Sequence, residues 1–238
     1  MAVGQCDFPN MHNVSGIALG TACAGIKQTI KDDILVIQMA EHSTCAAVFT
    51  QNAFCAAPVH VAKANLPHAP RWLLINSGNA NAGTGEQGMH DALVSCEELA
   101  KVTGGLANQV LPFSTGVIGQ PLPVEKIKVA LPNAIKNLSL NNWDKAAHAI
   151  MTTDTFPKAI SMVINIAGKS ITINGISKGA GMIQPNMATM LGFIATDATI
   201  SQALLQNCLA LAVEQSFNRI TVDGDTSTND ACVLMASG

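Results

Sequence analysis

The sequence is poor in charged and in aromatic side chains. Charged residues make up 12% of the 238 positions, about half the share of an average soluble domain. Aromatic residues contribute 4%, and tyrosine is absent. The formal net charge of −3 excludes the basic footprint that nucleic-acid-binding proteins carry. Because 48% of the residues are hydrophobic, we expect apolar surface to be hidden in a partner or in further chain.

Membrane, disulfide and metal patterns are also missing. The most apolar stretch, residues 203–213, is shorter than the roughly eighteen residues of a membrane span, and no signal-peptide pattern begins the chain. The seven cysteines are odd in number and form no C-x-x-C pair, so we interpret them as reduced thiols of a cytoplasmic protein. The six histidines are scattered without helical spacing, and we expect no metal site.

Hydrophobic periodicity predicts strands and helices that intermix along the chain. Strands are expected over 34–39, 45–51 and 72–76, and a hairpin over 159–166 and 170–174. Helices are expected over 84–103, 123–138, 143–151 and 201–217. Thr84 and Gln87 form a predicted capping box, and Pro132 should kink or split its helix. The predicted class is α/β, with α+β as the alternative, in layered sheets and helices.

Several familiar catalytic motifs fail. Gly168-Lys169-Ser170 resembles the end of a phosphate-binding loop, but Val163 stands where the first glycine belongs. Gly179-Ala180-Gly181 lacks the third glycine of a dinucleotide fingerprint, and no G-x-S-x-G elbow is present. A Ser-His-Asp triad is recognised by geometry, so the sequence leaves it open. No cofactor is indicated.

Threonine-rich loops remain as the candidates for chemistry. A threonine becomes a nucleophile when the chain is cut before it, because its freed α-amine, with an unperturbed pKa near 8, can act as a base. Ala188-Thr189 offers a small residue before such a threonine. From pattern alone, plain alternatives stay open: Thr189 as the start of a strand, Thr115-Gly116 as a turn, Lys178 as a solvated side chain, and 223–230 as a solvated turn or a cation loop.

The segment Lys178-Gly-Ala-Gly-Met-Ile-Gln-Pro-Asn-Met-Ala-Thr-Met-Leu191 resembles the signature of the ornithine acetyltransferase family, also called glutamate N-acetyltransferase, of arginine biosynthesis. The likeness spans nearly the whole chain. It continues, in the order of that family, through Gly25-Ile26-Lys27 with Asp32-Asp33 and through residues 47–52, 76–82, 114–119, 152–158 and 223–230.

The resemblance implies a precursor that cleaves itself between Ala188 and Thr189. Residues 1–188 would form an α chain and residues 189–238 the start of a β chain. Two α and two β chains would assemble as an α2β2 heterotetramer. Thr189 would be the nucleophile, Thr115 and Gly116 the oxyanion hole, and Thr153, Lys178 and Thr189 would bind substrate. The implied reaction moves an acetyl group from N-acetyl-L-ornithine to L-glutamate without a cofactor. Some members also use acetyl-CoA.

The chain departs from the family in its length. Family members continue well beyond the Asp223–Asp230 segment, so we expect the second domain to be incomplete and these 238 residues alone to be inactive in transfer. Two alternatives follow. The chain is an inactive truncated fragment that aggregates through exposed apolar faces, or it is a related N-terminal-nucleophile amidase or aminopeptidase that hydrolyses its substrate.

Overall fold

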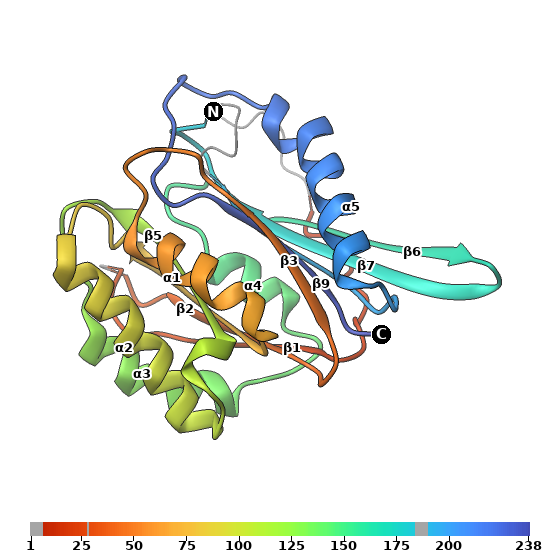
Figure 1. Cartoon of the computed structure of the whole chain (residues 1–238), viewed down its shortest axis with the longest axis horizontal. Coiled ribbons are helices and arrows are strands. Elements are labelled where there is room, and N and C mark those ends of the chain that lie inside the picture. The colour runs from red at the N-terminus through yellow and green to blue at the C-terminus, as the bar shows by residue number, and fades with distance from the viewer. Residues whose placement is uncertain (1–6, 28, 184–189) are drawn as a thin grey trace.

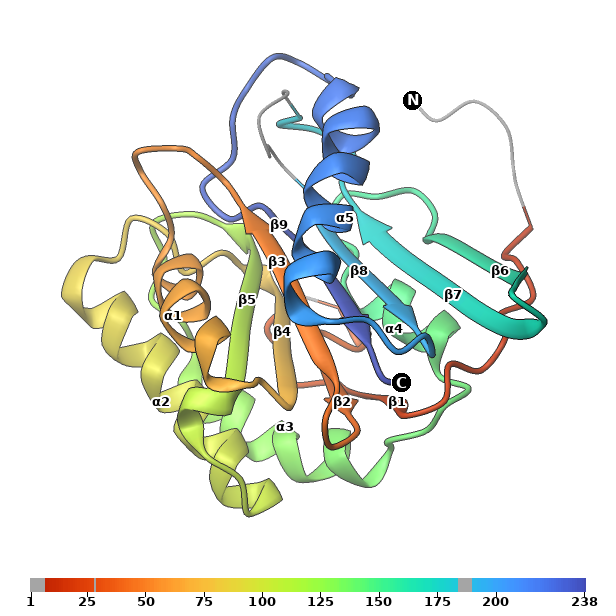
Figure 2. The ribbon, with the colours of Figure 1, turned by 45° about the vertical axis from the view of Figure 1, so that its right-hand side comes forward.

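The protein is built of four layers, with two sheets packed face to face and helices on both outer sides (Figure 1). The computed structural model describes residues 7–27, 29–183 and 190–238. The turned view in Figure 2 shows α5 over one sheet and α1, α2 and α3 beside the other. The predicted layered α/β class is confirmed.

The first sheet has the strand order β1-β2-β4-β5. Its strands are β1 (Ile17–Ala22), β2 (Ile34–Met39), β4 (Trp72–Asn79) and β5 (Val110–Val117). Only the β4–β5 pair is parallel. Strand β2 is buried on both faces: Leu35 and Ile37 belong to the core between the sheets, while Ile34 and Val36 belong to the core under the helices. This two-sided burial explains why its sequence is apolar at every position except Gln38.

The second sheet has the strand order β3-β9-β8-β7-β6. Its strands are β3 (Thr44–Phe49), β6 (Lys158–Ile166), β7 (Lys169–Lys178), β8 (Leu191–Thr196) and β9 (Ala231–Ala236). The β8–β9 pair is parallel, and the other pairs are antiparallel. Strand β6 lies at the edge of this sheet and leaves Ile160, Val163 and Ile166 exposed.

The described part of the chain has five α-helices: α1 (Ala57–Asn65), α2 (Gly85–Thr103), α3 (Val124–Lys136), α4 (Trp143–Ala149) and α5 (Gln202–Gln215). Helix α4 inserts the fully buried Trp143 into the core between the sheets. Helix α5 packs Leu205, Leu209 and Val213 on the outer face of the second sheet. None of these helices has the length and apolar character that crossing a membrane requires.

The capping box predicted at Thr84 and Gln87 is wrong, and of the kink or split expected at Pro132 the split is wrong. Thr84 does stand at the N-cap of α2, but its hydroxyl donates to Asn81 Oδ1 and Gln87 donates to Asp91, so no capping box forms. Pro132 does not split α3, which runs through it as one helix. Pro132 is exposed, so the carbonyl that loses its backbone partner four residues earlier can be hydrated.

Gly20 in β1 offers a test of the packing between α3 and the first sheet. A Cβ at Gly20 would lie 2.0 Å from the carbonyl oxygen of Ala134 in α3. We therefore expect Gly20→Ala to lower the free energy of unfolding by about 1–3 kcal/mol or more, measured by urea unfolding.

Gly175→Ala in β7 is the matched control. Its added Cβ would meet Ile160 at 3.4 Å and Ile194 at 3.7 Å, which are ordinary contact distances. We expect a change within about 1 kcal/mol. Equal loss of stability in both variants would contradict the packing described for Gly20.

Candidate active site

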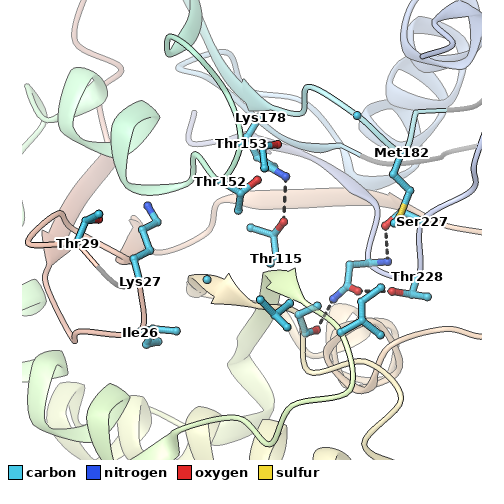
Figure 3. A pocket seen from close by; sticks show the side chains of 17 residues that line it. Ile26, Lys27, Thr29, Thr115, Thr152, Thr153, Lys178, Met182, Ser227 and Thr228 are labelled. Atoms are coloured by element: carbon cyan, nitrogen blue, oxygen red, sulfur yellow. Dashed lines mark hydrogen bonds between the residues drawn. The ribbon is translucent and has the colours of Figure 1, made fainter. Parts of the chain in front are cut away.

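A cavity of about 640 Å³ opens where the ends of β4, β5 and β7 meet three loops. Figure 3 shows Lys178 reaching Thr115, with Thr152 and Thr153 beside them and Lys27 at the other side. Among its described lining residues, Lys27 and Lys178 are the cations, and no acidic side chain lines it. This charge balance favours an anionic group inside the cavity.

A buried hydrogen bond joins the two sheets at this cavity. Lys178 is the last residue of β7, and its Nζ donates to Thr115 Oγ1 of β5 at 3.0 Å. Both residues are buried, at 7% and 8% exposure. Burial lowers the pKa of Lys178, and the charges of Asp154 and Asp230 oppose that shift. Because Thr115 accepts this bond with its oxygen, its own hydroxyl proton is available to an acceptor in the cavity.

Gly116 follows Thr115 at a point where β4 and β5 touch. It pairs with Gly78, and both glycines have a positive φ, of 136° and 107°. A Cβ on Gly116 would lie 2.3 Å from the carbonyl carbon of Gly78, so no side chain fits there. The chain at Gly116 is thereby left as bare backbone against the cavity.

The loop before β2 is held at the cavity by hydrogen bonds from its backbone N–H groups to the Asp33 side chain. The buried Asp33 carboxylate accepts the N–H groups of Ala24, Ile26 and Lys27 at 2.6, 2.6 and 3.0 Å. Lys27 Nζ donates to the carbonyl oxygens of Asp32 and Ala149 at 3.1 and 2.9 Å. Burial lowers the pKa of Lys27, which its acidic neighbours partly counter.

Asp154 holds a second loop, with Thr152 and Thr153, against the end of β7. Its carboxylate accepts the Gly179 N–H at 2.8 Å and pairs with Lys158 at 2.5 Å. Burial acts to raise the pKa of Asp154, but the hydrogen bonds from Lys158 and from the Gly179 and Thr152 backbone outweigh it and bring the pKa below its ordinary value.

The third loop, residues 227–230, is buried and lines the cavity with Ser227, Thr228 and Asn229. The reading of 223–230 as a wholly solvated turn is therefore wrong for these four residues, although 223–226 are exposed. Asn229 Nδ2 donates to the carbonyl oxygens of Ala80 and Ser114 at 2.6 and 3.0 Å, which fixes the chain just before Thr115. Within the described ranges, no group of histidine, cysteine, aspartate and glutamate could hold a metal ion.

The structure brings four of the predicted site residues to one cavity: Thr115, Gly116, Thr153 and Lys178. Ala188 and Thr189 lie outside the described residues. Sequence reasoning assigned no role to Lys27 or to Ser227–Asn229, although both segments carried the family likeness. The only sequence signal for these residues is that they are polar and lie beside short apolar strands. That pattern does not distinguish residues that line a cavity from residues of a solvated loop.

Comparison with known proteins gives a consistent result. The family model described as "ArgJ family" matches residues 18–238. The arginine biosynthesis bifunctional protein ArgJ of Methylococcus capsulatus is 64% identical over 224 residues, which are 94% of this chain and 55% of that protein. The protein of the same name from Pseudomonas fluorescens is 58% identical over 238 residues, covering 100% and 59%. This chain thus spans little more than half the length of these curated relatives.

Solved structures agree. The arginine biosynthesis bifunctional protein of Bacillus halodurans has a TM-score of 0.66 at 31% identity, over 74% of this chain and 92% of that chain. Ornithine acetyltransferase of Mycobacterium tuberculosis, complexed with ornithine, has a TM-score of 0.63 at 31% identity, over 72% and 92%. An L-aminopeptidase D-Ala-esterase/amidase of Ochrobactrum anthropi, a variant of the Ntn hydrolase fold, has a TM-score of 0.59 at 11% identity, over 98% and 76%, and shares the fold alone.

The family model covers nearly the whole chain, and its relatives include an ornithine acetyltransferase of the same fold. The chain belongs to the ArgJ family.

Proposed function

We propose that this chain is the part of an ornithine acetyltransferase that carries its nucleophile and oxyanion hole. The reaction transfers an acetyl group from N-acetyl-L-ornithine to L-glutamate through an acetyl-threonine at Thr189. The chain cleaves itself between Ala188 and Thr189, which gives an α chain of residues 1–188 and the start of a β chain from residue 189.

The buried Lys178–Thr115 hydrogen bond is the observation that carries this proposal. It places a cation, a hydroxyl and the bare backbone of Gly116 on one cavity whose described lining holds no acid. A tetrahedral oxyanion needs such fixed donors, and an amino-acid carboxylate needs a cation. Both substrates carry an α-carboxylate, so Lys178 can serve each half-reaction, and Thr153 lies beside it.

The position of β8 supports Thr189 as the nucleophile. Leu191, the first residue of β8, pairs with Lys178, so the chain enters β8 at the lysine that faces the cavity. The two matched structures at 31% identity support a cut chain as well: both solved chains are shorter than this one, whereas the curated relatives are longer.

The chemistry is a ping-pong acyl transfer. Thr189 Oγ attacks the acetyl carbonyl while its proton passes to the α-amine, and the developing oxyanion accepts hydrogen bonds from the Thr115 hydroxyl and the Gly116 N–H. The C–N bond to ornithine then breaks, the leaving amine takes the proton, and acetyl-threonine remains. The α-amine of glutamate attacks this ester in the same way and restores Thr189.

The wider setting is part of the proposal. The two pieces assemble as α2β2 in the cytoplasm, and the transfer needs no cofactor. The relatives are named bifunctional, which supports acetyl-CoA as a second acetyl donor to glutamate. The amidase alternative has only a shared fold at 11% identity in its favour, and hydrolysis of acetylornithine without glutamate would be its signature.

Self-cleavage is tested by the intact mass of the purified chain beside Thr189→Ala. We expect the wild type to give two fragments, 1–188 and 189–238, and the variant to give one uncut chain, because alanine has no hydroxyl to attack the preceding carbonyl. Thr172→Val, at a buried threonine of β7 outside the cavity, should cut like wild type. A single uncut mass for the wild type would contradict self-cleavage of this chain.

The oxyanion hole is tested by Thr115→Val, which keeps the side-chain shape and removes the hydroxyl. We expect the rate of acetyl transfer to fall by about 100-fold or more. The assay uses acetylornithine and glutamate, with the chain joined to the C-terminal remainder of the Methylococcus capsulatus relative. Thr172→Val is again the control, and equal rates for the two variants would remove Thr115 from the mechanism.

A further inference from the structure

The outer face of the second sheet is covered by a helix over only part of its width. Helix α5 packs Leu205, Leu209 and Val213 on outward-pointing residues of β3 and β9, among them Ala46 and Cys232. Figure 2 shows α5 lying across this sheet, with β7 and β6 beside it. In the described part of the chain, no helix covers the outer face of β7 and β6.

The register of the strands continues this outer face to β6. Leu234 of β9 packs in the core under α5 and pairs with Ile194 of β8. Ile194 pairs with Gly175 of β7, which in turn pairs with Ile160 of β6. Because directly paired residues lie on the same face of a sheet, Ile160 and every second residue of β6 point outward. These β6 residues are all apolar and exposed: Ile160 at 58%, Met162 at 43%, Ile164 at 36% and Ile166 at 55%.

One flank of α5 is turned toward these uncovered strands. Gln202 and Gln206 exchange hydrogen bonds of 2.7 to 3.3 Å with the backbone of β3, the strand at the far edge of the sheet. These bonds fix one flank of the helix at that edge, so the opposite flank faces β7. The helical repeat of about 3.6 residues places four exposed residues on that flank: Leu204, Cys208, Leu211 and Ala212.

The four β6 residues and the four α5 residues together make an apolar surface, which we call the open face. Gly175 lies between Ile160 and Ile194 and has no side chain, so nothing stands up from β7 at this point. A helix that is apolar on its exposed flank as well as its buried one is typical of a helix covered from more than one side. A contiguous exposed apolar surface of this kind marks an interaction site.

We propose that the open face is the docking surface for the segment that follows Gly238 in the longer curated relatives. This segment packs the apolar face of a helix beside α5 and over β7 and β6. An apolar helix flank next to an apolar sheet face is filled by a second helix that contacts both, with its axis about 8–10 Å from that of α5. The inference concerns how the second sheet is completed and does not rest on the proposed reaction.

The last residues of the chain lie at one end of the open face. Ala236 ends β9 and pairs with Thr196 of β8, and the Ser237 N–H donates to the Thr196 carbonyl oxygen at 3.0 Å. A Cβ on Gly238 would lie 3.6 Å from Thr199 Oγ1, in the short connection between β8 and α5. A segment joined at Gly238 therefore starts beside the first turn of α5 and reaches the open face without crossing the molecule.

Length and linkage favour this occupant over a second copy of the chain. The matched part is 55% of the Methylococcus capsulatus protein and 59% of the Pseudomonas fluorescens protein, so these relatives hold enough further chain to supply a helix. A segment joined at Gly238 is present at an effective concentration of about millimolar, whereas a second copy must be met by diffusion.

The test compares this chain alone with the same chain joined to the C-terminal remainder of the Methylococcus capsulatus relative. Carbene labelling from a photoactivated diazirine marks exposed side chains, is located by peptide mass and needs no catalytic activity. In the joined protein we expect the labelling of Ile160, Met162 and Leu211 to fall severalfold. Val129 of α3, which is 75% exposed and lies outside the open face, should be labelled equally in both proteins.

A charge placed on the open face gives a second measurement. Ile160→Lys puts an ammonium where the segment docks, and Val129→Lys is the matched control at an exposed apolar residue. We expect Ile160→Lys to lower the Tm of the joined protein by about 4 °C or more, because a buried lysine is costly. The same change should leave the Tm of the chain alone nearly unchanged, and Val129→Lys should do so in both proteins.

The outcomes separate the possible occupants. Equal labelling of the open face in the two proteins would overturn the inference, as would an equal effect of Ile160→Lys on their Tm values. Protection in the chain alone that grows with protein concentration would overturn it too, because a second copy would then be the occupant. A joined protein that shows the protection but transfers no acetyl group would support this inference and contradict the proposed function.

Discussion

The hydrogen bond between Lys178 and Thr115 joins the two sheets at the cavity, and the arrangement of the site depends on it. Lys178 ends β7 in the second sheet, and Thr115 lies near the end of β5 in the first. Asn229 makes a similar link. It lies just before β9 of the second sheet, and its side chain donates to the carbonyl oxygens of Ala80, directly after β4, and Ser114 in β5 of the first sheet. The spacing of the sheets is thereby set where chemistry is proposed.

The same bond also explains the charge of the cavity. A buried ammonium is expensive unless carboxylates stand near it, and Asp154 and Asp230 do so without lining the cavity. Asp154 and Asp230 are not among the residues that line the cavity, whereas Lys178 is. An anionic substrate group therefore meets a cation whose compensating charges it does not contact. This separation of counter-charge from binding surface favours carboxylates and developing oxyanions.

Local patterns sufficed where an element has one clear signal. Strand β2 was predicted with its observed bounds because Ile34–Met39, apolar except for Gln38, follows Asp33 and ends two residues before Glu41. Strand β1 was missed because its small residues, among them Gly20, give weak alternation, and β5 was missed because Pro112 interrupts its run. The hairpin of β6 and β7 was found, although β7 continues to Lys178 beyond the predicted end. Its last residues are held by pairing with β8, which no local pattern reveals.

The site was less predictable than the fold, for a related reason. From pattern alone, Thr115-Gly116 and Lys178 suited a turn and a solvated lysine; only likeness to a family assigned them to a site. They meet through contacts between residues far apart in sequence, and so do Asn229 and Ala80. The hydrogen bonds from the backbone N–H groups of the loop to the Asp33 carboxylate were also missed. A carboxylate directly before an apolar strand is common in surface loops, so the sequence gives no sign of this role.

The strand order of the second sheet has a consequence for how this chain could fold again after denaturation. Strands β8 and β9 lie between β3 and β7, so the piece after residue 189 is interleaved with the piece before it. A cut there removes no strand pairing, and the two pieces would stay together until the sheet itself opens. Once opened, however, they would have to find each other by diffusion. Refolding would change from a unimolecular to a bimolecular process, and its yield would depend on protein concentration.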